Sequence, residues 1–117
     1  MSAEALPKIV EKPWGREIWY AVTDRYAGKV LEVRAGHALS LQYHRQKKET
    51  LYFRKGSGTL VLGDEEIPIR PDLSVTIEPG TRHRIVAATD LEILEVSTPE
   101  LDDVVRLEDR YGRTAQP

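Results

Sequence analysis

Short runs of β-branched, aromatic and aliphatic residues recur along the chain, and glycine, proline and aspartate separate them. Almost no stretch shows sustained helical periodicity, so the pattern indicates an all-β fold. Strands are expected at residues 17–21, 29–33, 39–44, 49–55, 59–62, 73–77, 83–87 and 91–97. Many short strands joined by tight turns are typical of a sandwich, a barrel or a jelly roll.

The length of 117 residues fits one domain, and a compact fold of this size buries about two thirds of its unfolded surface. We find no repeat, low-complexity segment or linker, so we expect a single domain over residues 1–117, with a barrel at 13–98 and a C-terminal arm at 99–117. The charged end from residue 102 lacks strand alternation. It is either an arm packed on the barrel or a frayed end, and composition alone favours fraying.

Composition limits the partners of the chain. Hydrophobic residues make up 40% and charged residues 31%, as in soluble globular proteins. The start has acidic residues and a proline where a signal peptide needs a basic end and an apolar run, so we expect a cytoplasmic protein without a membrane partner. The net charge of −2 provides no long-range field for nucleic acid, and we expect no DNA or RNA binding.

Four polar side chains are candidate metal ligands. The chain has no cysteine, so nitrogen and oxygen donors must hold any metal. Gln42 and His44 lie two apart on an expected strand and therefore leave the same face. Glu49 begins the next strand after a short connection, and a barrel can bring His83 over the first pair. We expect one divalent metal ion per chain, with zinc first and manganese, iron, cobalt or nickel as the other metals this donor set allows.

The spacing of these residues resembles the two cupin motifs. The pattern Gly-x5-Gln-x-His-x4-Glu-x6-Gly begins at Gly36, and Gly-x2-His begins at Gly80. The resemblance implies a cupin jelly-roll β-barrel in which Gln42, His44, Glu49 and His83 converge on one ion. Glutamine replaces the usual first histidine, and a neutral amide donor favours Lewis-acid chemistry over redox chemistry.

Within the cupins, the chain resembles the isomerase domain of type II mannose-6-phosphate isomerases. The likeness extends through Lys-Pro-Trp-Gly at 12–15, Leu-Ser-Leu-Gln at 39–42, Pro-Gly-Thr-Arg-His-Arg at 79–84 and the ending Asp-Asp-Val-Val-Arg-Leu-Glu-Asp-Arg-Tyr-Gly-Arg at 102–113. It implies a free-standing, metal-dependent isomerase of mannose 6-phosphate and fructose 6-phosphate. His-Arg-Gln-Lys at 44–47 and Leu51 depart from the family's usual residues, so the pocket wall differs.

An aldose–ketose isomerase needs a base that is not a metal ligand. Lys47 and Lys48 are the candidates, provided that burial or like-charge crowding lowers the pKa. We expect Lys48 to be this base and Lys47 to bind substrate; the alternative is that both lysines are solvated hairpin charges.

Arginine forks are the best ligands for a substrate phosphate. We expect Arg84, Arg110 and Arg113 to bind it, and Arg106 is also available. Arg110 and Arg113 belong to the C-terminal arm, which must then fold across the barrel mouth.

An apolar row also indicates self-association. Leu39, Leu41 and Tyr43 alternate with the ligands Gln42 and His44, so we expect them to face outward. A homodimer would cover this row; an N-terminal segment with Trp14 and Trp19 is the alternative cover.

Two other functions stay open. One is a non-catalytic or regulatory cupin that binds a sugar or a sugar nucleotide. The other is a different metal-dependent cupin enzyme, such as an oxygenase or an epimerase, and the glutamine and the C-terminal likeness argue against it.

Overall fold

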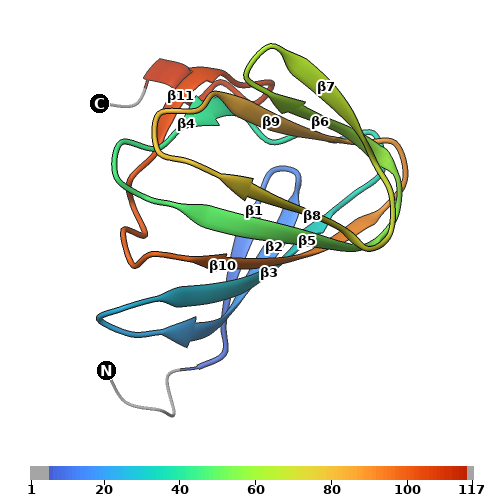
Figure 1. The fold of residues 1–117 in the computed structure, drawn as a ribbon. Helices are drawn as coiled ribbons and strands as arrows, with labels where there is room; N and C mark the ends of the chain where they lie inside the picture. Colours follow the sequence, from blue (N-terminus) through green and yellow to red (C-terminus); the bar gives the residue numbers. More distant parts are fainter. Residues whose placement is uncertain (1–5, 116–117) are drawn as a thin grey trace.

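The computed structural model describes residues 6–115, which form two antiparallel sheets facing each other (Figure 1). One sheet has the order β1-β2-β3-β10-β5-β8, with β1 Lys8–Lys12, β2 Gly15–Val22, β3 Ala27–Val33, β10 Leu91–Ser97, β5 Glu49–Lys55 and β8 Leu73–Ile77. The other has the order β11-β4-β9-β6-β7, with β11 Val105–Glu108, β4 Leu41–Tyr43, β9 His83–Ala87, β6 Gly58–Leu62 and β7 Glu65–Ile69. The all-β jelly-roll barrel predicted from the sequence is confirmed. Within the described residues, no helix is long and apolar enough to cross a membrane.

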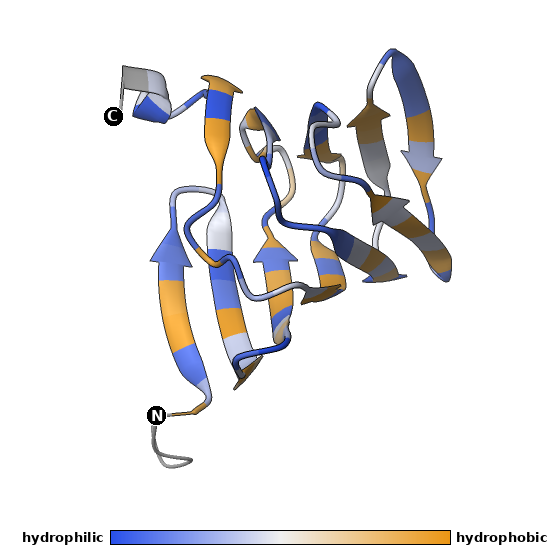
Figure 2. Ribbon diagram, turned by 60° about the vertical axis from the view of Figure 1, so that its left-hand side comes forward, coloured by the Kyte–Doolittle hydropathy of each residue, from blue (hydrophilic) through white to orange (hydrophobic). Residues whose placement is uncertain are grey.

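The hydrophobic core lies between the two sheets. Alternate residues of each strand point inward, and the ribbon in Figure 2 shows the resulting alternation of apolar and polar positions. Phe53 on β5 pairs in register with Ile93 on β10, and neither side chain is exposed. Leu60 and Ile85 supply matching apolar side chains from the other sheet. Each such burial stabilises the fold by roughly 1.5–3 kcal/mol, so the core holds the two sheets together around the polar groups of the interior.

The turn between β1 and β2 depends on a glycine. A Cβ added at Gly15 would lie 1.9 Å from the carbonyl oxygen of Glu32, so no larger residue fits against β3 here. The neighbouring Trp14 is buried in the core. Together the two residues fix the β1–β2 hairpin, whose strand β1 contributes one wall of the interior cavity described below.

The C-terminal arm is ordered against the barrel. Composition alone favoured a frayed end, whereas the family resemblance favoured an arm folded onto the barrel. The described part of the arm is packed on the barrel, because β11 pairs with β4 through Val105–Tyr43 and Arg106–Gln42. Backbone pairing at a sheet edge needs no apolar alternation, so the sequence pattern did not indicate β11, β1 or β7. A 3₁₀ turn (η2, Arg113–Ala115) follows.

The predicted outward row of apolar residues is wrong at Leu39. This side chain is buried in the core, whereas Leu41 and Tyr43 are half-buried. The strand begins only at Leu41, and an isolated bridge at Ala38 precedes it. Strict alternation therefore cannot be extended back to Leu39, and the argument for a dimer loses one of its three residues.

Candidate metal centre

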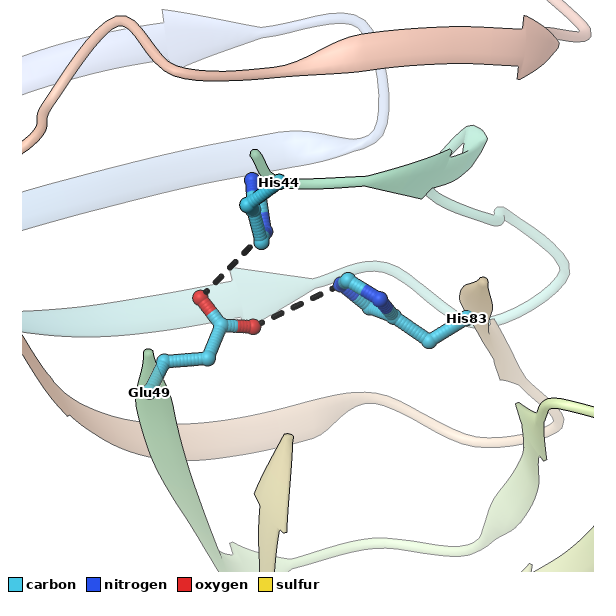
Figure 3. Close-up of side chains that lie close together, drawn as sticks. All are labelled: His44, Glu49 and His83. Carbon is cyan, nitrogen blue, oxygen red and sulfur yellow. Dashed lines mark ion pairs between the residues drawn. The ribbon is translucent and has the colours of Figure 1, made fainter. Parts of the chain in front are cut away.

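Three buried side chains from both sheets meet inside the barrel (Figure 3). His44 directly follows β4, Glu49 begins β5 and His83 begins β9. Their donor atoms all lie within 4.8 Å of one another. The Nε2 atom of His44 is 3.6 Å from Oε1 of Glu49, and the Nε2 atom of His83 is 3.5 Å from Oε2. The predicted convergence of these three residues on one point is therefore present in the fold.

The hydrogen bonds of the two imidazoles leave the inner nitrogens free. Nδ1 of His44 donates to the carbonyl oxygen of Asp103 at 2.5 Å, and Nδ1 of His83 donates to that of Thr81 at 2.9 Å. A carbonyl oxygen only accepts, so each neutral ring carries its proton on Nδ1 and a lone pair on Nε2. Both Nε2 atoms are buried and have no hydrogen-bond partner among the described residues. Two such lone pairs facing a carboxylate fit a divalent cation.

Gln42 lies beside this cluster on the cavity wall. It pairs in register with His83 across β4 and β9, so the two side chains share one face of the sheet. Its Oε1 accepts a hydrogen bond of 2.5 Å from the hydroxyl of Ser40. Ligation by Gln42 stays a prediction, whereas the two histidines and Glu49 form a group that could hold a metal.

A buried lysine neutralises the acids around the cluster. Nζ of Lys47 lies 3.1 Å from Glu49 and 3.0 Å from Glu95, and all three residues are buried. Burial alone would lower the pKa of Lys47, but the charges of Glu95 and Glu49 raise it above its ordinary value. Lys47 therefore does not meet the condition for a lysine base, which is a lowered pKa, and stays an ammonium ion at neutral pH.

The two carboxylates that flank Lys47 have opposite pKa shifts. Burial opposes ionisation of Glu49, but N–H donation from the imidazoles of His44 and His83 in their protonated form, together with the charge of Lys47, holds its pKa well below the usual range. Burial and the nearby charge of Glu49 raise the pKa of Glu95. Sequence reasoning missed Glu95, although an acid among the inward positions Leu91, Ile93 and Ser97 of β10 was a readable signal.

Asp103 fixes the loop between β4 and β5. Its carboxylate accepts hydrogen bonds from the backbone N–H groups of Arg45, Gln46 and Lys47 at 2.7–2.9 Å. Its carbonyl oxygen orients His44. The arm thus positions one candidate ligand and the buried lysine. Aspartate commonly binds backbone N–H groups, but nothing local links Asp103 to a loop more than fifty residues earlier.

The predicted base Lys48 lies away from the cluster. Its side chain is exposed and pairs with the exposed Glu78 at 3.4 Å. It is not among the residues that line the interior cavity, whereas Lys47 is. The two lysines are neighbours in an irregular connection, where no strand alternation tells which one points inward.

The three predicted arginines have different positions. Arg84 lines the cavity, but its guanidinium donates to the carbonyl oxygens of Leu39 and Glu108. Arg113 also lines the cavity and binds Asp109 through Nε at 2.8 Å and Nη2 at 3.0 Å. Arg110 is exposed, donates to a backbone carbonyl outside the cavity and is not brought to the site.

The cluster opens into a cavity of about 950 Å³. Both sheets, the strand β1 and the C-terminal arm line it, and it contains Gln42, Lys47 and Glu95 as well as the three candidate ligands. Lys12 and Arg106 also line it. A cavity of this size accommodates a small-molecule ligand.

Comparison with known sequences identifies relatives in sugar metabolism. The chain is 34% identical over 110 residues to the xanthan biosynthesis protein XanB of Xanthomonas campestris pv. campestris strain B100. It is 33% identical over 109 residues to the mannose-1-phosphate guanylyltransferase ManC of Salmonella typhimurium strain LT2. These alignments cover 90% and 89% of this chain but only 24% and 23% of the relatives. The chain thus spans about a quarter of the length of the curated relatives.

Solved structures share the fold at low identity. KdgF from Halomonas sp. aligns with a TM-score of 0.75 and 18% identity, over 81% of this chain and 88% of that one. An RmlC-like cupin from Shewanella frigidimarina NCIMB 400 aligns with a TM-score of 0.76 and 14% identity, over 87% and 92%. The model of the family described as "Mannose-6-phosphate isomerase C-terminal" matches residues 2–109. The chain therefore belongs to this family and has the cupin fold.

Proposed function

We propose that the chain is a metal-dependent isomerase that interconverts mannose 6-phosphate and fructose 6-phosphate through an enediolate. The observation that carries the proposal is the pair of buried Nε2 lone pairs on His44 and His83, which face Glu49 in the cavity. Family membership supports the choice of substrate. The longer relatives are named for xanthan biosynthesis and for guanylyl transfer, and neither name mentions an isomerase. The isomerase activity of this chain is therefore our proposal.

The residues that line the cavity have different roles in the proposed reaction. His44, Glu49 and His83 would hold the ion, which when bound supplies a Lewis acid for the negative charge that develops on the substrate oxygens. The ammonium group of Lys47 compensates the negative charges of Glu49 and Glu95. The three candidate ligands, Lys47 and Glu95 are all buried, which strengthens these interactions.

Glu95 is our candidate for the base. Moving a proton between adjacent carbons requires a group that is not a metal ligand, and the exposed Lys48 does not reach the cavity. Glu95 lines the cavity and binds Lys47. Its pKa is raised by burial, which makes a carboxylate a better partner for proton transfer near neutral pH.

A direct assay tests this proposal. The metal-free chain is loaded with zinc, manganese, iron, cobalt or nickel, and conversion of mannose 6-phosphate to fructose 6-phosphate is followed by NMR. We expect turnover with at least one metal, and a loss of about a hundredfold or more in kcat for Glu95→Gln at unchanged metal content. Lys48→Gln is the matched control and keeps its activity. A wild type inactive with all five metals contradicts the isomerase.

A sugar-binding cupin without catalysis is the second candidate. The positions of Lys48 and Arg110 outside the cavity favour it, since fewer of the predicted catalytic and phosphate-binding groups are then available. Saturable binding of mannose 6-phosphate without turnover would support this function.

A further inference from the structure

Arg106 lines the cavity, and one N–H donor of its guanidinium group has no hydrogen-bond partner in the part of the chain that the structure describes. It pairs in register with Gln42 across β11 and β4, and Gln42 pairs with His83 across β4 and β9. Residues directly opposite each other share one face of a sheet, so Arg106 faces the same side as the candidate ligand His83. Its Nε atom is buried and has no hydrogen-bond partner among the described residues.

A second cation from the other end of the chain lies close to Arg106. Lys12, the last residue of β1, lines the same cavity. Burial lowers the pKa of Lys12, and the positive charge of Arg106 is one of the further causes. Burial and the charge of Arg113 likewise lower the pKa of Arg106. Several cations therefore crowd one side of the cavity.

The two acids whose charges act on Lys12 and Arg106, Glu17 and Asp109, already have other partners. Glu17 pairs with Lys29 at 3.5 Å and accepts a hydrogen bond of 2.8 Å from Trp19. Asp109 binds the guanidinium of Arg113 with both carboxylate oxygens. None of the ion pairs among residues 6–115 includes Lys12 or Arg106.

Partly buried cations without a counter-ion destabilise the fold unless an anion joins them. A guanidinium with an unpaired Nε–H and an ammonium ion in the same cavity match a phosphate, which offers several acceptor oxygens and a double negative charge. One strand separates β11 from β9, so Arg106 and His83 are about 10 Å apart along the sheet. That separation is of the same order as the length of a hexose phosphate.

We propose that Arg106 and Lys12 form the phosphate subsite of the cavity. A phosphorylated sugar binds with its phosphate on these two cations and its carbonyl end at His44, Glu49 and His83. The inference rests on the proposed function for the choice of sugar phosphate. It replaces the predicted subsite of Arg84, Arg110 and Arg113. The first two bind backbone carbonyls, and Arg113 binds Asp109.

Calorimetric titration of the zinc-loaded full chain tests the subsite. The probes are mannose 6-phosphate, mannose and inorganic phosphate. We expect Arg106→Gln to weaken binding of mannose 6-phosphate by about tenfold to a hundredfold. Mannose affinity and zinc content stay unchanged, and the melting temperature without phosphate does not fall, because the variant removes a cation that has no counter-ion among the described residues. Arg110→Gln is the matched control, because Arg110 is an exposed arginine of the same arm, and it should bind like the wild type.

Three results would contradict the phosphate subsite or its assignment to a sugar phosphate. Unchanged affinity for mannose 6-phosphate in Arg106→Gln, or a wild type that binds mannose as tightly as mannose 6-phosphate, overturns the subsite. Tighter binding of inorganic phosphate than of mannose 6-phosphate overturns the assignment to a sugar. If Arg106→Gln does not fold, Lys12→Gln on the β1–β2 hairpin carries the same test and the same expected loss.

Turnover measured on the same proteins separates the two proposals. If Arg106→Gln weakens binding of mannose 6-phosphate but the wild type shows no turnover, the subsite proposal stands and the isomerase proposal is rejected. If the wild type turns over mannose 6-phosphate and Arg106→Gln changes neither turnover nor affinity, the isomerase proposal stands and the subsite proposal is rejected.

Discussion

Replacing Lys47 by methionine tests the buried charge balance beside the candidate ligands. Methionine keeps the unbranched apolar stem of lysine and removes only the ammonium ion. In the metal-free protein this leaves Glu49 and Glu95 buried without their shared cation, which lies 3.1 Å and 3.0 Å from them. The two carboxylates then repel each other inside the barrel.

Two estimates limit how much Lys47→Met lowers the free energy of unfolding. Removing one partner of a buried ion pair typically destabilises a protein by about 3–5 kcal/mol. The protein can reduce this penalty if one carboxylate takes up a proton. Since the ordinary pKa of the carboxyl is 4.5, this uptake costs about 3 kcal/mol at pH 7. We therefore expect Lys47→Met to lower the free energy of unfolding by about 3–5 kcal/mol.

Urea unfolding after removal of metal by a chelator measures this loss. Lys48→Met is the matched control, because the neighbouring lysine pairs with Glu78 at an exposed site and such pairs contribute at most about 1 kcal/mol. Saturating zinc should reduce the difference between Lys47→Met and wild type, since the ion supplies positive charge at Glu49. Equal unfolding free energies for the two methionine variants would refute the reasoning.

Three further predictions concern the arm and the assembly. Asp103→Ala removes the acceptor of three loop N–H groups, and we expect a loss of about 1–3 kcal/mol in urea unfolding. Arg113 lowers the pKa of Asp109 below its ordinary 3.8, so this contribution to stability is present above pH 3.8 and is lost as the pH falls through the lowered value. Acid titration monitored by amide exchange of the arm should show the loss, and Asp109→Asn should abolish its pH dependence. The homodimer stays a prediction: sedimentation at micromolar concentration should give a dimer for wild type and a monomer for Leu41→Asp.

The sequence predicts the barrel and the core of the site because both depend on short-range rules. Alternation places inward and outward side chains wherever a strand is regular, as on β5 and β10. The spacing of His44, Glu49 and His83 matches a motif whose geometry the barrel imposes. Even Glu95 was predictable, because alternation puts it on the inner face of β10.

The remaining features depend on contacts between distant segments. Whether Lys47 or Lys48 points inward is decided in an irregular loop, and Asp103, 56 residues after Lys47, fixes its backbone. The position of Arg106 follows from the pairing of β11 with β4, which the charged composition of the arm does not indicate. Leu39 is buried because the strand starts two residues after it.

Metal analysis of the purified chain tests the central claim most directly. The sequence has three histidines, and His37 provides the control because it binds the hydroxyl of Tyr111 and does not line the cavity. Inductively coupled plasma mass spectrometry should find about one divalent ion per chain in wild type and in His37→Ala. It should find almost none in the folded double variant His44→Ala, His83→Ala. Near-stoichiometric metal in that double variant would contradict the site.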